Sequence, residues 1–139
     1  MLQITITTPK LPQVELDLSK TDVREPVHDI IRAQLSKQFS ESGEPSWKSL
    51  APATLKKPRK SARPFDTISH EMWASFTYKN NAEHHFTYGK DFIQVGSDMK
   101  DIPIYQMEGT KTITARSITA TKLMADAVCK VIADSIVKG

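Results

Sequence analysis

The sequence predicts an α+β domain in which an antiparallel β-sheet of about four to five strands packs against two long helices. Apolar residues recur at helical spacing in residues 22–39 and 123–136, which predicts the two helices. Residues 2–8 and several short segments between 76 and 108 alternate apolar and polar side chains, as half-buried strands do. Residues 43–64 follow neither period and predict a long, flexible basic loop within the domain.

The length of 139 residues is that of one domain, so residues 1–139 are expected to share a single core. No run of apolar residues is long enough for a membrane span, and the segment Met1–Thr7 lacks the features of a signal peptide. The single cysteine, Cys129, excludes an intrachain disulfide and fits a reducing cytoplasm. We expect Cys129 to be a small apolar filler on a helix face.

The N-terminal residues predict two strands. Leu2, Ile4 and Ile6 alternate with polar residues, and β-branched side chains favour an extended conformation. Two prolines then bracket a turn, after which residues 14–18 alternate again. A hairpin is the simplest interpretation, although proline cannot donate to a strand ladder and the second segment could be an irregular extension.

The two helices have recognisable starts. Ser19, Thr21 or Asp22 could cap the first helix, and Pro26 is expected within its first turn. Thr119 or Thr121 could cap the second helix. Both helices would bury one apolar face against the sheet.

The middle of the chain predicts the remaining strands. Ile68, Met72, Trp73 and Phe76 predict a short helix or turn that leads into a strand, in which Phe76 and Tyr78 alternate into a turn at 79–81. Residues 84–88 and 92–96 then flank a Gly-Lys-Asp reversal typical of a β-hairpin. Residues 102–108 predict a further strand.

The basic residues are concentrated in one segment. No acidic residue lies between Glu44 and Asp66, whereas six basic residues do, and the rest of the chain is mildly acidic. Clustered cations could contact DNA phosphates, which requires no fixed geometry. Alternatively, the segment is simply a solvated loop. The basic residues are Lys48, Lys56, Lys57, Arg59, Lys60 and Arg63.

No catalytic constellation is recognisable. His70-Glu71 lacks the second histidine of a zinc-protease helix, and the adjacent His84 and His85 would point to opposite faces of a strand. Cys129 has no histidine partner nearby in the sequence. We therefore expect a non-enzymatic protein with no metal, no cofactor and no small-molecule substrate.

Three local patterns follow one another in a characteristic order. The first is WKSLAPAT at 47–54, and the second is FDTISHEMWASF at 65–76. The third comprises IQVGS at 93–97, IYQMEG at 104–109 and ARS at 115–117. Together they span most of the chain, and the sequence resembles the phage virion morphogenesis (tail-completion) family of Mu-like and P2-like phages and prophages.

This resemblance implies a structural protein of the head–tail junction or tail end, of the neck, tail-terminator or tail-completion type. Such proteins act as homo-oligomeric rings, here of six copies by analogy with the symmetry of the tail. The implied partners are further copies of the chain and other phage tail or neck proteins, with non-specific contact to DNA. The implied location is the virion, after synthesis in the cytoplasm of the bacterial host.

Candidate contact residues follow from this implication. In a ring, the loop 48–63 could face DNA in the lumen through its six basic residues. Trp47 is expected to pack beneath the loop, with an interface role as the alternative. Tyr105, Met107 and Glu108 could pack between subunits or simply be buried in a strand, and Arg116 could form a tethering ion pair or lie on the surface. The alternative function is a small nucleic-acid-binding module that uses the same loop. The candidate interface residues are Trp47, Leu50, Tyr105, Met107, Glu108 and Arg116.

Overall fold

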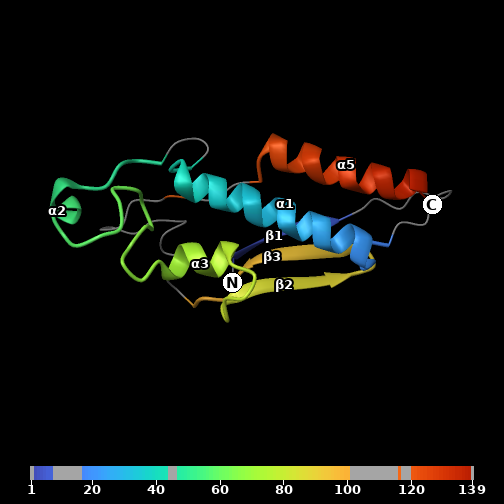
Figure 1. The fold of residues 1–139 in the computed structure, drawn as a ribbon, viewed down its shortest axis with the longest axis horizontal. Coiled ribbons are helices and arrows are strands. Elements are labelled where there is room, and N and C mark those ends of the chain that lie inside the picture. The colour runs from blue at the N-terminus through green and yellow to red at the C-terminus, as the bar shows by residue number, and fades with distance from the viewer. Residues whose placement is uncertain (1, 8–16, 44–46, 101–115, 117–119, 139) are drawn as a thin grey trace.

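The computed structural model describes residues 2–7, 17–43, 47–100, 116 and 120–138. Within these ranges it confirms an α+β fold (Figure 1). α1 lies between α5 and the strands, and α3 packs against α1 and the β2–β3 pair. The elements in chain order are β1 (Leu2–Thr7), α1 (Thr21–Ser40), α2 (Pro52–Leu55), α3 (Glu71–Thr77), β2 (His84–Gly89), β3 (Phe92–Ser97) and α5 (Lys122–Lys138).

The described part of the sheet has three antiparallel strands in the order β1-β3-β2, fewer than the four to five predicted. Ile4 of β1 is opposite Val95 of β3, which is in turn opposite Phe86 of β2. The predicted strands at 14–16 and 102–108 lie outside the described residues. Leu18, predicted at the end of a strand, instead lies in a turn, where it is fully buried.

The short helix predicted around Met72 and Trp73 is confirmed as α3, but the strand predicted from Phe76 and Tyr78 is wrong. Phe76 lies in helix α3, where Met72, Trp73 and Phe76 all face the core. Trp73 and Phe76 follow Met72 by one and four residues, a spacing that places all three on one face of a helix. This pattern is stronger evidence than the alternation of only two residues that predicted a strand. Tyr78 follows the helix and is exposed.

Helix α1 extends one residue beyond its predicted range at each end, but it begins differently. Its N-cap is Lys20, whose side chain has no acceptor and makes no capping bond, and the hydroxyl of the predicted cap Ser19 donates to Asp17 at 2.5 Å. Pro26 lies in the second turn of the helix rather than in the first. Because proline has no N–H, the carbonyl of Asp22 lacks its usual helical hydrogen bond from this position. The buried apolar residues repeat every four positions and are Val23, Val27, Ile31, Leu35 and Phe39.

Helix α5 packs mainly on the outer side of α1, whereas the sequence predicted that both long helices pack against the sheet. The hydroxyl of Thr121 accepts from the backbone N–H of Met124 at 3.2 Å, which confirms Thr121 as a capping residue. Met124 and Val128 are buried. Cys129, however, is exposed and is not the apolar filler expected. It follows Val128 directly, and each residue of an α-helix is rotated by about 100° from the one before, so Cys129 lies off the buried face. Among the described residues, no helix is sufficiently long and apolar to cross a membrane.

Candidate interaction arm

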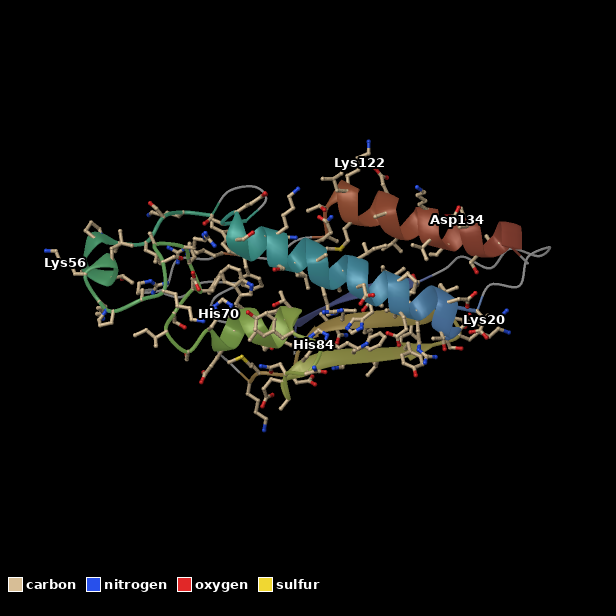
Figure 2. All side chains as sticks on the ribbon, in the orientation of Figure 1. Lys20, Lys56, His70, His84, Lys122 and Asp134 are labelled. Atoms are coloured by element: carbon tan, nitrogen blue, oxygen red, sulfur yellow. The ribbon has the colours of Figure 1, made fainter. Side chains whose placement is uncertain are left out.

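The six basic residues lie on a projecting segment, residues 48–63, which we call the basic arm. Figure 1 shows α2, in the middle of this segment, at one end of the long axis and away from the sheet. Lys56 lies at the outer end of the arm (Figure 2). The segment predicted as a loop therefore contains one short helix, for which Pro52 supplies a favourable first residue.

The arm exposes most of its charge. The side chains of five of its basic residues are exposed, whereas Arg59 is partly buried. Arg59 donates to the backbone carbonyls of Ser61 at 3.2 Å and Arg63 at 2.9 Å, so it stabilises the arm from within. The exposed residues are Lys48, Lys56, Lys57, Lys60 and Arg63.

The base of the arm is fixed by Arg116. Its Nε donates to the carbonyl of Lys48 at 2.8 Å, and its Nη2 donates to the carbonyl of Ser49 at 3.1 Å. These partners are backbone carbonyls rather than the carboxylate that the predicted ion pair requires. Arg116 is 8% exposed, and this burial lowers its pKa. The planar guanidinium therefore tethers the start of the arm to the chain that leads into α5.

Trp47 packs beneath the arm, as one of its two interpretations predicted. Its ring meets Phe39 and Phe65 edge-on, at centroid distances of 5.7 and 5.1 Å. Gly43, with φ of 90°, allows this close packing, because a Cβ there would lie 2.5 Å from Trp47 Cδ1. Leu50 is partly buried nearby in the chain. The interface roles of Trp47 and Leu50 stay predictions, and Tyr105, Met107 and Glu108 lie outside the described residues.

The far end of the arm is held by a hydrogen-bonded chain. The hydroxyl of Ser61 donates to Asp66, whose other carboxylate oxygen lies 2.9 Å from His70 Nδ1. Burial alone would raise the pKa of Asp66, but the hydrogen bonds with Ser61 and His70, together with the charges of His70 and Arg63, outweigh burial and hold that pKa below its ordinary value. The arm is therefore ordered at both ends. Between and beside these anchors, Leu55 and Ile68 remain 46% and 63% exposed.

A second polar cluster lies inside the domain and was not foreseen. His28 Nε2 of α1 lies 2.8 Å from His84 Nε2 of β2, and His84 Nδ1 donates to the carbonyl of Ser75 at 3.0 Å. Because His84 carries its proton on Nδ1, its Nε2 accepts and His28 Nε2 donates. His28 Nδ1 then bears a buried lone pair with no hydrogen-bond partner among the described residues. The ring of Phe86 stacks on the ring of His28, with the two ring centroids 3.7 Å apart.

Burial controls the charge of this pair. It lowers the pKa of His28 to about 4, with a further contribution from the nearby cation of Arg32. Burial also lowers the pKa of His84. Both rings are therefore neutral near neutral pH. His28 could have been suspected from the sequence, since it follows Val27 and precedes Ile31 by three residues on the buried helix face.

His84 and His85 do point to opposite faces of the strand, as predicted. His85 Nδ1 lies 2.9 Å from Asp98, on the face away from His28. His84 is not simply a half-buried strand histidine, however, because it pairs with α1.

Within the described ranges, no three histidine, cysteine, aspartate or glutamate side chains are grouped so that they could hold a metal ion. Comparison with known proteins identifies no relative: no family model matches the chain, and no curated protein or solved structure is significantly similar to it.

Proposed function

We propose that the protein is a structural component of a tailed-phage virion, of the tail-completion, neck or tail-terminator type. In this proposal several copies, six by analogy with the symmetry of the tail, form a ring at the head–tail junction or tail end. The order of the patterns at 47–54, 65–76 and 93–97 supports the assignment. Repetition of one heterologous contact around an axis closes such a ring.

The observation that carries the proposal is the basic arm. It projects from the body, yet Arg116 and Asp66 hold its two ends. It also carries the exposed apolar side chain of Leu55 beside its exposed cations, and the exposed Ile68 follows shortly after it in the chain. Interfaces commonly combine apolar contacts with a polar rim, so the arm suits attachment to a neighbouring copy or to another tail or neck protein.

Native mass tests this proposal. Light scattering would be recorded at several protein concentrations, with and without purified tail tubes or neck complexes. A ring, or a monomer that adds as a ring to the end of a tube, supports the proposal. A monomer that binds no particle component at any concentration contradicts it.

The second candidate is a small nucleic-acid-binding module, with no ring required. Its supporting observation is that no ion pair joins the five exposed cations of the arm to a described carboxylate, so they are available to phosphates. The candidate requires duplex affinity that decreases steeply with salt. A ring whose lumen is lined by the arms would also show this affinity. Native mass distinguishes such a ring from a nucleic-acid-binding module that forms no ring.

Substitution of four arm residues tests the DNA contact. Lys56, Lys57, Lys60 and Arg63 would be changed together to alanine, leaving the inward-facing Arg59 in place. If each contacts one phosphate, the salt slope of duplex binding decreases by about four. A control that changes the exposed Lys122 and Lys130 of α5 to alanine should leave the slope unchanged. Equal slopes for both variants would exclude the arm as the DNA contact.

A further inference from the structure

The histidine pair joins three elements at one point. His28 belongs to α1 and His84 to β2, while the carbonyl that orients His84 belongs to Ser75 of α3. In Figure 2, His84 lies beneath α1 at the start of the sheet. His28 is 1% exposed, so no solvent compensates a change in its charge. The contact between α1 and β2 therefore depends on the protonation of this pair.

We propose that the His28–His84 pair is an acid-sensitive latch, which holds α1 on β2 while the pair is neutral and releases this contact when the pair gains a proton. The proposal does not depend on the phage assignment. It concerns a property of the fold that either candidate function would share.

The position of the added proton explains the release. The neutral pair has two ring protons: one joins the two Nε2 atoms, and the other joins His84 Nδ1 to Ser75. If both hydrogen bonds are kept, a third proton can lie only on His28 Nδ1, whichever ring carries the charge. That atom is buried and has no acceptor among the described residues. A buried N–H without an acceptor and a buried positive charge on the pair are both costly in the interior, so the contact opens to hydrate them.

The charged groups around the pair favour the neutral state. From α1, the cation of Arg32 opposes protonation of His28, whereas Glu25 and Asp29 favour it. From β2, His85 opposes protonation of His84, whereas Asp98 after β3 favours it. α3 faces the pair with the uncharged carbonyl of Ser75. Burial and Arg32 together outweigh the carboxylates, so acid must overcome an unfavourable site.

Nuclear magnetic resonance of the full chain tests the latch directly. The ring C–H signals of His28 and His84 would be titrated while amide exchange is followed along α1 and β2. As the pH falls from the ordinary histidine pKa of 6.5 to about 4, we expect the opening constant for these amides to rise by up to about tenfold per pH unit. Ordinary titration of both rings, together with an opening constant in α1 that does not change with pH once the intrinsic exchange rate is divided out, overturns the proposal.

A pair of variants supplies the matched comparison. In His28→Gln the side-chain amide can donate to His84 Nε2 from the same position, but it does not titrate. We expect this variant to lose most of the acid-induced opening. His85→Gln, on the opposite face of the sheet, should retain it. If both variants open like the wild type, the latch is excluded, and if His28→Gln does not fold, the wild-type titration decides.

Discussion

Arg116 donates to the backbone carbonyl of Lys48 at 2.8 Å, although the two residues are 68 positions apart in the chain. A second bond to Ser49 completes a two-pronged contact. The side chain thus fixes where the basic arm leaves the body, and it does so from outside the arm. The shape of the surface proposed to bind partners therefore depends on a residue that is itself buried.

Arg116→Ala should destabilise the protein by about 2 kcal/mol, because two carbonyls lose their charged donor. Trypsin should also cut faster after Lys56 and Lys60, since the base of the arm is released. The stability and digestion rate of Arg116→Lys should lie between those of the wild type and Arg116→Ala, because an ammonium cannot reproduce the planar pair of donors. Urea midpoints and digestion rates check this. Wild-type values for Arg116→Ala would show that the tether contributes nothing.

Gly43→Ala should destabilise the protein by at least about 1 kcal/mol, because the position has φ of 90° and its new Cβ would meet the ring of Trp47. Neighbouring Ser42 has φ of 60°, so Ser42→Gly should relieve strain and stabilise by roughly 0.5–1 kcal/mol. Thermal unfolding of both variants gives the comparison. The same sign for both would contradict the backbone explanation.

The free energy of unfolding should decrease in mild acid. The folded pKa of His28, about 4, lies below its ordinary 6.5, so the unfolded chain binds more protons between these values. The stabilisation associated with neutral His28 is complete above the ordinary pKa and is lost as the pH falls through this window, by up to about 3 kcal/mol. Urea denaturation of the wild type and His28→Gln at a series of pH values measures the difference. A parallel pH dependence for the two proteins would be inconsistent with this origin.

A separate loss should follow in stronger acid from Asp66. Its folded pKa lies below the ordinary 3.8, so its contribution is complete above 3.8 and is lost as the pH falls through the folded value. Asp66→Asn should lack this step and should be less stable at neutral pH by about 1 kcal/mol. Asp134→Asn, an exposed change on α5, serves as the control and should keep the step. Unfolding monitored from about pH 5 to about pH 2 distinguishes them.

The sequence predicted those elements whose apolar pattern is long. The residues of α1 repeat every four positions from Val23 to Phe39, so its range was predicted to within one residue at each end. Phe76 was placed in a strand because two alternating residues are too few to distinguish a strand from a short helix.

Side-chain partners distant in the sequence could not be predicted. The contact of His28 with His84 spans 56 positions, and no local pattern encodes it. The interpretation of Arg116 as a tether anticipated its role but not the carbonyls that it binds. Both contacts depend on which distant segments the tertiary fold brings together, which periodicity alone does not determine.

The central position of β3 has a consequence for the order of folding. β2 and β3 are adjacent in the chain and can pair as a local hairpin. β1 instead pairs with a distant segment, since its Ile4 lies opposite Val95 of β3. Closing so long a loop costs entropy before its contacts form, so we expect β1 to join last. Pulse-labelled hydrogen exchange during refolding would then protect the amides of β2 before those of β1. Until β1 arrives, the exposed edge of β3 is open to strands from other chains, which makes the half-built sheet the stage most vulnerable to aggregation.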